Sequence, residues 1–258
     1  MSEPASMLRD LYHYPVKGLT PQRLPRAALL PGQPIGCDRL YAVENGPSGF
    51  DPQVPAHLPK QRFLMLMRNE RLARLTSAFD TDTHVLSIAF AGREVARGNL
   101  RRSAGRAVVE RFLSDYCADE LRGAPKVLSA PGHSFADVSR KVVSIINLAS
   151  VRAIETVVGA RVDPLRFRAN LYVTGWPAWH EFALLGGTLK IGQQAEIRIV
   201  KRIVRCAATD VDPQTGARDL AIPRSLTAAC GHGDCGVYGE VVTGGEIAVG
   251  DRIATAAA

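Results

Sequence analysis

Short apolar segments separated by glycine, proline and aspartate are the feature that most limits what this chain can fold into. Apolar stretches of about four to eight residues bounded by turn residues are typical of strands. A chain built mostly from such stretches forms a barrel or a sandwich, because single strands are not stable alone. We expect strands within residues 8–14, 38–44, 62–69, 71–80, 85–95, 167–175, 188–204 and 238–253, although 71–80 also fits a helical turn.

Two segments have the periodicity of helices instead. The first spans residues 106–121, and its apolar side chains recur at helical spacing: Val109, Phe112, Leu113, Tyr116 and Leu121. A second helix is expected to begin with Ser150 as its N-cap and to end at Gly159. Together with the strands, these segments predict a mainly β fold with a few helices.

A stretch with proline and glycine, GAPKVLSAPGHS at residues 123–134, follows the first expected helix. Domain boundaries usually fall in such stretches, because few contacts cross them. We therefore expect an N-terminal domain at residues 1–122 and a second domain at residues 123–258.

Charge and cysteine content narrow the cellular context. The 258 residues carry a net charge of +7, which favours an anionic partner without identifying it. Nucleic acid is a weakly supported partner, because the basic residues are scattered and accompany no zinc-finger spacing or aromatic RNA-binding motif. The sequence has neither signal-peptide character nor an apolar run of membrane-span length. Five cysteines, an odd number, predict reduced thiols in a cytoplasmic protein without membrane attachment.

Cys206 raises the sharpest question about chemistry. It follows Arg205 at the end of an expected strand, and the turn residues 212–216 come soon after. A single cysteine in such a place most often fills the core. If the strand ends there, however, Arg205 and Cys206 both turn toward one pocket. The neighbouring cation then favours the thiolate, which binds soft metals.

The segment YPVKGL offers a second candidate. Pro15 breaks the strand, and Lys17 and Gly18 follow in an expected loop. Glycine lets backbone N–H groups approach a ligand closely, and lysine supplies a point charge for a phosphate. The alternative is an ordinary solvated lysine in a turn.

The segment RFRANLYV offers a third candidate. Arg166, Arg168 and Asn170 alternate with other residues, so in a regular strand their side chains share one face. Guanidinium groups bind phosphate, and an amide can bind the edge of a heterocycle. The alternative is an exposed strand face, the usual place for arginine.

The segment CGHGDCGVYGEV contains Cys230, His232 and Cys235, which have donors that a metal could use. Two cysteines and one histidine do not complete a four-ligand zinc site, and the glycines indicate a loop that approaches a ligand. Tyr238 follows at the start of the next strand, where its phenol either donates into a pocket or packs. The aromatic segment GWPAWHEF, residues 175–182, either forms a substrate wall or packs on a loop.

These segments together resemble the MOSC family, the C-terminal domain of molybdenum cofactor sulfurase, with the β-barrel domain that often precedes it. LYHYPVKGL and GCDRLYAVENG resemble signatures of the N-terminal domain. FRANLYVTG, VRCAATDVDPQTG, HGDCGVYGEV and GEIAVGD resemble successive signatures of the MOSC domain, in the family's order. The resemblance covers nearly the whole chain and implies a MOSC β-barrel packed with an N-terminal β-barrel-like domain.

The resemblance also implies a cofactor site. Cys206 is implied as the protein ligand of molybdenum and as the catalytic residue. The implied positions that bind molybdenum cofactor are Lys17, Gly18, Arg39, Asn147, Arg168, Asn170, Arg205 and Tyr238. The chain departs from the amidoxime-reducing members of the family at Gly18, where serine is frequent, at Ala169, where proline is common, and at Asn147, where a small hydroxyl residue is common.

The function implied is the reduction of N-oxygenated or similar small substrates at the molybdenum cofactor. No ferredoxin-like set of cysteines follows, so an external flavin or iron–sulfur protein is expected to supply electrons. One alternative is a carrier of molybdenum cofactor or of sulfur on Cys206, without turnover of its own. The other alternative is a basic barrel that binds nucleic acid and no metal.

Overall fold

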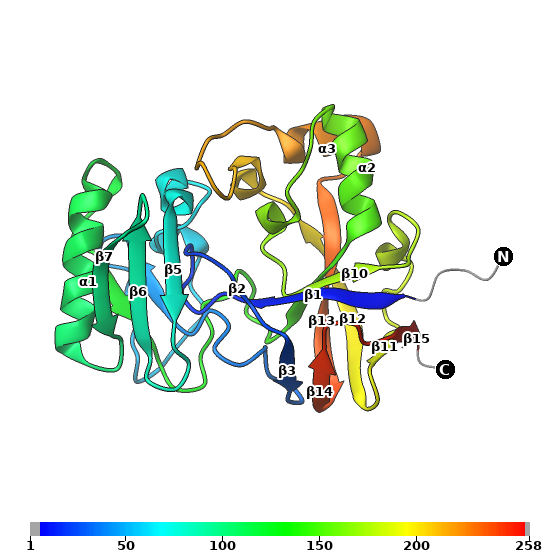
Figure 1. Ribbon diagram of the computed structural model, residues 1–258, viewed down its shortest axis with the longest axis horizontal. Coiled ribbons are helices and arrows are strands. Elements are labelled where there is room, and N and C mark those ends of the chain that lie inside the picture. Colours follow the sequence, from blue (N-terminus) through cyan, green and yellow to red (C-terminus); the bar gives the residue numbers. More distant parts are fainter. Residues whose placement is uncertain (1–5, 256–258) are drawn as a thin grey trace.

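The computed structural model, which describes residues 6–255, contains two β-rich parts that lie side by side (Figure 1). The larger part is built on a curled eight-stranded sheet with the order β15-β11-β12-β13-β9-β10-β1-β2. Its strands are β1 (Met7–His13), β2 (Gln22–Arg23), β9 (Val143–Asn147), β10 (Leu171–Thr174), β11 (Thr188–Ile191), β12 (Ala195–Val204), β13 (Asp234–Thr243) and β15 (Ile253–Thr255). Strand β10 runs parallel to β9, and the other neighbours are antiparallel.

Two helices and a two-stranded ribbon complete the larger part. Helices α2 (Leu148–Val158) and α3 (Ile222–Cys230) lie together above one end of the sheet (Figure 1). The ribbon joins β3 (Arg26–Leu29) to β14 (Gly245–Ala248). Buried aliphatic side chains of the curled sheet form its main core, among them Leu11, Ile197 and Val237. This core holds β12 in the middle of the sheet through Ala195, Ile197 and Ile199.

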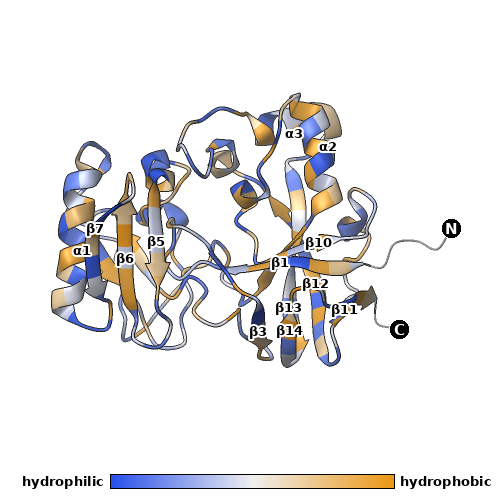
Figure 2. Cartoon of the chain, viewed as in Figure 1, coloured by the Kyte–Doolittle hydropathy of each residue, from blue (hydrophilic) through white to orange (hydrophobic). Residues whose placement is uncertain are grey.

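The smaller part packs one helix on a three-stranded sheet. The sheet consists of β5 (Leu75–Phe79), β6 (Val85–Phe90) and β7 (Arg93–Asn99), and helix α1 (Ser103–Tyr116) covers it. Figure 2 shows β6 as largely hydrophobic, whereas α1 mixes hydrophobic and hydrophilic residues. Only one face of α1 is therefore buried, through Val109 and Leu113. A further pair, β4 (Ala42–Glu44) and β8 (Lys126–Leu128), lies beside this sheet.

Strand pairing crosses the expected boundary near residue 123 in both directions. Strands β1 and β3, from the first 30 residues, pair with β10 and β14 of the larger part. Strand β8, after the boundary, pairs with β4 of the smaller part. The first 122 residues therefore contribute strands to both parts, and the division at 122–123 stays a prediction.

The mainly β fold with a few helices is confirmed, but several local predictions are wrong. Residues 62–69 form no strand: the 3₁₀ turn η1 (Lys60–Arg62) leads into a buried turn in which Asn69 Oδ1 accepts from Met65 N. A continuous apolar run is buried in either conformation, so periodicity cannot separate them. Residues 71–80 divide into the 3₁₀ turn η2 (Glu70–Arg74) and β5.

Other corrections concern the ends of elements. Residues 85–95 hold β6 and the start of β7 rather than one strand, because Ala91 and Gly92 turn the chain. Helix α2 begins earlier than expected, since Asn147 is its N-cap and accepts from Ala149 N, whereas Ser150 is inside the helix. Its end at Gly159 agrees with the expectation. Helix α3 is short and was not predicted.

Close packing of α1 against β7 gives the first testable prediction. A Cβ atom at Gly98 would lie 2.1 Å from the backbone oxygen of Gly105 in α1, so no side chain fits there. We expect Gly98→Ala to lower the free energy of unfolding by about 2 kcal/mol, since overpacking shifts the helix backbone. Chemical denaturation measures this loss. Gly36→Ala is the control, because a Cβ there meets open space; equal stability of the two variants would contradict the packing argument.

Candidate functional site

A cavity of about 270 Å³ lies between the two parts of the molecule, and both contribute to its wall. Eight basic residues line it against only two acidic ones, Asp38 and Asp137. The basic residues are Lys17, Arg39, Lys60, Arg166, Arg168, Lys201, Arg202 and Arg205. Such an excess of positive charge in a concave site favours an anionic ligand.

Cys206 is placed at the cavity by the end of a strand. Strand β12 stops at Val204, and Cys206 leads into the 3₁₀ turn η6 (Ala207–Asp210). The Cys206 carbonyl accepts from Thr209 N and Thr209 Oγ1, both at 3.0 Å, which fixes the backbone at the cysteine. The half-buried thiol and Arg205 both line the cavity, as expected if the strand ended there.

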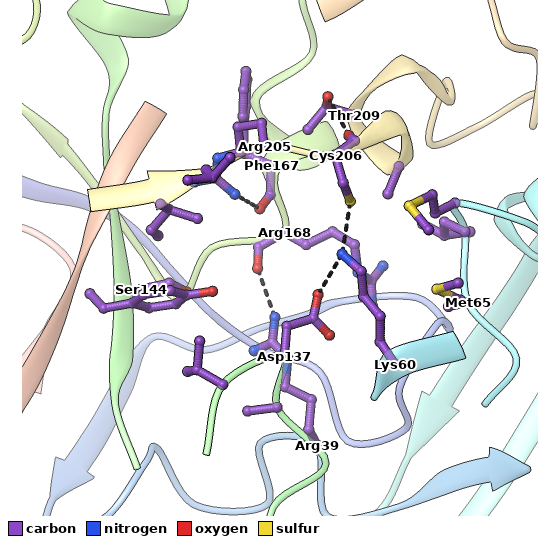
Figure 3. A pocket seen from close by; sticks show the side chains of 18 of the residues that line it. Arg39, Lys60, Met65, Asp137, Ser144, Phe167, Arg168, Arg205, Cys206 and Thr209 are labelled. Atoms are coloured by element: carbon purple, nitrogen blue, oxygen red, sulfur yellow. Dashed lines mark hydrogen bonds and ion pairs between the residues drawn. The ribbon is translucent and has the colours of Figure 1, made fainter. Parts of the chain in front are cut away.

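Lys60 is a cation in direct contact with the thiol, and its sequence context did not predict this contact. Its ammonium donates to Cys206 Sγ at 3.1 Å and lies 3.5 Å from Asp137 Oδ2 (Figure 3). Burial works to lower the pKa of Lys60, but Asp137 and Cys206 outweigh it, and the pKa is raised. Lys60 therefore carries its charge beside the sulfur at neutral pH. It comes from η1, 146 positions away, and no local pattern signals the contact.

Asp137 pairs with a second lysine, Lys17. The Lys17 ammonium donates to Asp137 Oδ1 and to Phe135 O, the latter at 2.9 Å. Burial lowers the pKa of Lys17, and the carboxylate counteracts this. Burial alone would raise the pKa of Asp137, but Lys17 and Lys60 lower it well below its usual range. Lys17 is thus a buried, paired cation rather than a solvated turn lysine.

Two arginines stack on one tyrosine at the cavity wall. The guanidinium carbons of Arg39 and Arg168 lie 4.5 Å and 4.4 Å from the ring centroid of Tyr14. Arg39 Nη2 donates to Arg168 O at 2.9 Å, and Arg168 Nη2 donates to Leu19 O at 2.8 Å. Burial lowers the pKa of Arg168, with Arg39 adding to the effect. Cation–π contacts offset part of the cost of holding two like charges together.

The prediction that Arg166, Arg168 and Asn170 share one face of a strand is wrong. Arg166 belongs to the 3₁₀ turn η4 (Pro164–Phe167), and Arg168 follows it in the left-handed conformation at φ 50°. Arg166 turns instead toward the loop after Cys206, where it pairs with Asp212 and Asp219. The alternation of the sequence therefore does not translate into one face, because strand β10 begins only at Leu171.

Arg205 keeps one donor free. Its Nε donates to Cys235 O at 2.8 Å and its Nη1 donates to Phe167 O at 2.9 Å. Its Nη2 is buried and has no hydrogen-bond partner among the described residues. A Cβ at Gly236 would lie 3.1 Å from this nitrogen and 2.5 Å from Ile145 O, so only glycine fits beside it. Since buried donors are normally paired, Arg205 Nη2 marks a place for a ligand acceptor.

The remaining implied residues divide into those that line the cavity and one that does not. Gly18, Asn170 and Tyr238 line it, and burial raises the pKa of the Tyr238 phenol. The Asn170 amide is already used within the fold, since its oxygen accepts from Ser144 and its nitrogen donates to Tyr12 O. Asn147 is fully buried away from the cavity lining, where it caps α2 and donates to Glu181.

The other candidate metal donors are not gathered. Cys230 is exposed at the end of α3, whereas Cys235 is buried and burial raises its pKa to about 12. His232 accepts from Asp234 N and packs on Trp179 and Phe182. Within residues 6–255, no group of three histidine, cysteine or acidic side chains could hold a metal ion. All five cysteines are free thiols, and the aromatic segment 175–182 does not line the cavity.

Comparison with protein families decides the kinship of the chain. Residues 129–254 match the family model of the MOSC domain, and residues 5–119 match that of the MOSC N-terminal beta barrel domain. The chain belongs to the MOSC family. This family is associated with proteins that bind molybdenum cofactor. The two matched segments leave residues 120–128 between them, and the expected boundary falls there.

Two solved structures are similar to this MOSC protein at low sequence identity. The YUAD protein from Bacillus subtilis has 13% identity and a TM-score of 0.46, with 97% of this chain and 94% of that chain covered. YiiM from Geobacillus stearothermophilus has 17% identity and a TM-score of 0.35, with 45% and 54% covered. No curated protein gives a significant match. Within the described part of the chain, no helix is both long and apolar enough to cross a bilayer, and the cytoplasmic location stays a prediction.

The cavity residues fit a cofactor of the kind associated with the family. Its phosphate needs donors that the fold leaves free, and Arg205 Nη2 is such a donor. Its metal needs a soft ligand, and the Cys206 thiol opens into the same cavity. Within residues 6–255, no group of three or more histidine, cysteine or acidic side chains could complete a metal site, so the other ligands of the metal would come from the cofactor and from substrate.

Proposed function

We propose that this MOSC protein holds molybdenum cofactor in the cavity, with Cys206 as the protein ligand of the metal. The observation that carries the proposal is the pairing of a free thiol with an unpartnered guanidinium donor, Arg205 Nη2, in one strongly basic cavity. A buried donor without a partner lowers stability unless a ligand accepts a hydrogen bond from it. Core packing alone or a solvated surface therefore does not explain this combination.

The basic residues would share the binding of the cofactor. Arg168 and Arg205 donate to backbone carbonyls only, so their charges are not neutralised by a carboxylate within the described residues. They are the best candidates to bind the phosphate. Lys17 pairs with Asp137, and Arg39 pairs with Asp38. These two cations line the same wall of the cavity, but their charges are partly neutralised and would attract the phosphate less.

The reaction that we propose is the reduction of an N-oxygenated or similar small substrate. When bound, the cofactor supplies the two-electron redox centre at which the N–O oxygen is removed. The chain holds the thiol in place through Thr209 and keeps the Lys60 ammonium beside it. This charge would attract the substrate's oxygen to the thiol side of the cavity. Electrons would come from a separate flavin or iron–sulfur protein.

Metal content and turnover of the protein test this proposal. Protein from a host that makes molybdenum cofactor should contain about one molybdenum per chain, and protein from a cofactor-deficient host should contain none. The loaded protein should oxidise a reduced dye when an N-hydroxylated substrate is added. A chain without molybdenum from either host would refute cofactor binding.

The turnover assay also separates the proposed reductase from a carrier. A loaded chain that gives no rate with any N-oxygenated substrate, yet passes molybdenum cofactor to an acceptor enzyme, would establish the carrier function instead. Polynucleotide affinity with a steep salt dependence, and no molybdenum, would favour nucleic-acid binding.

A further inference from the structure

The loop that follows Cys206 is fastened to the smaller part of the molecule by one arginine. Arg218 Nη1 donates to Ala207 O at 2.9 Å. Its Nη2 donates to Met67 O at 2.7 Å and to Glu70 Oε2 at 3.0 Å, with Leu66 O at 3.3 Å. A single guanidinium thus joins two segments that are far apart in the sequence.

Both segments belong to the wall of the cavity. Ala207 directly follows Cys206, and its carbonyl is the first of turn η6. Met65–Met67, here called the methionine segment, lines the cavity from the smaller part. Figure 3 shows Met65 on the same side of the cavity as Lys60, which contacts the thiol. Arg218 therefore spans from the residue after the thiol to the methionine segment.

The same loop packs closely on η2 at a second point. Gly216 has φ +71°, and a Cβ there would lie 3.0 Å from Glu70 O and 2.9 Å from Arg74 Cγ. No side chain fits between the loop and η2. The hydrogen bonds of Arg218 are thus part of a closely packed contact between the loop and η2, and they are not an isolated surface ion pair.

We propose that Arg218 is a positioning residue that holds the methionine segment against the Cys206 loop and so limits the size of molecules that reach the thiol. The role needs the planar fork of arginine, whose separate nitrogens donate in two directions at once. A lysine keeps the charge but carries its donors on one nitrogen, so it lacks the two separate nitrogens that reach Ala207 O and Met67 O. The inference concerns access to the thiol and is independent of which cofactor the cavity holds.

Thiol accessibility in the full-length, cofactor-free protein tests this role. Alkylation of each cysteine is followed by mass spectrometry with a small reagent, iodoacetamide, and a bulky one, fluorescein maleimide. We expect Arg218→Gln to raise the rate at Cys206 about tenfold with the bulky reagent and less than about threefold with the small one, because loss of several hydrogen bonds frees the wall locally. Arg218→Lys should behave like Arg218→Gln, and Glu70→Gln should give a smaller change in the same direction.

Other cysteines and a second arginine serve as controls. Exposed Cys230 reports the intrinsic reactivity of each reagent, and buried Cys117 and Cys235 report general unfolding. Arg224→Gln changes an exposed arginine of α3 and should leave Cys206 unaffected. The proposal is overturned if Arg218→Gln leaves the ratio of bulky to small reagent rates unchanged, if lysine restores it, or if Cys117 and Cys235 react equally faster. A protein that binds no molybdenum could still pass this test.

Discussion

Replacing Cys206 by alanine is expected to remove molybdenum from the protein and to lower its reductase turnover at least about 100-fold. Mutation of residues that only hydrogen-bond to a metal ligand commonly lowers metal affinity or activity about 10–100-fold, and loss of the ligand itself should cost no less. The Cys206 sulfur is the one soft donor that the chain offers at the cavity within residues 6–255 besides thioether sulfur. Metal analysis of the purified variant and dye-coupled turnover measure the two effects. Cys230→Ala, an exposed cysteine outside the cavity, is the matched control and should retain both properties.

The variant is informative because the fold does not depend on the thiol. Cys206 Sγ accepts from Lys60, and Lys60 keeps Asp137 when the sulfur is removed. The backbone carbonyl of Cys206 accepts a hydrogen bond from Thr209, and this contact does not involve the cysteine side chain. We therefore expect an unchanged thermal midpoint for the cofactor-free variant. Full molybdenum content in Cys206→Ala would show that another group ligates the metal.

The sequence predicted the placement of Cys206 for a physical reason. A strand that ends at Val204 and a turn that starts at Asp212 leave only a short connection, which must begin at the end of that strand. Both Arg205 and Cys206 then reach the cavity at the strand end. The order of the family signatures brought Lys17 and Arg39 to the same place, which local periodicity alone would not have done.

The missed residues are those whose partners are remote. Lys60 contacts Cys206 across 146 positions, and Arg218 contacts Met67 across 151. Such pairs form only when the two parts of the molecule pack together. The residues next to Lys60 and Arg218 in the sequence therefore do not indicate these contacts. Asp137 was missed for the same reason, since it contacts Lys17 across 120 positions.

Some wrong predictions arose from backbone conformations that side-chain patterns do not encode. Arg168 adopts a positive φ at the end of η4, so Arg166 and Asn170 do not lie on one regular strand. Arginine is not a residue that favours this region, so its sequence gave no warning. The conformation is held by tertiary contacts, namely the Tyr14 ring and Leu19 O.

Replacing Arg166 by leucine is expected to lower the free energy of unfolding by about 3 kcal/mol, at the lower end for broken buried ion pairs because its partners are partly exposed. The side chain is 2% exposed and donates to both oxygens of Asp219 at 2.8 Å and to Asp212 Oδ2 at 3.1 Å. It also donates to Asp210 O at 3.1 Å. Leucine fills much of the volume but leaves two carboxylates and a carbonyl without their donor.

The loss should appear as a fall of about 6–12 °C in the thermal midpoint, given the usual scaling for chains of this size. Arg161→Leu is the control, since that arginine is exposed and makes no ion pair among the described residues. Arg166 anchors the loop that begins after Cys206. Relative to the unchanged protein, the variant should therefore increase the rate of alkylation at Cys206 more than the rate at Cys235. Equal stability of the two leucine variants would mean that the loop is held by Arg218 and by the packing of α3, without a contribution from the buried guanidinium.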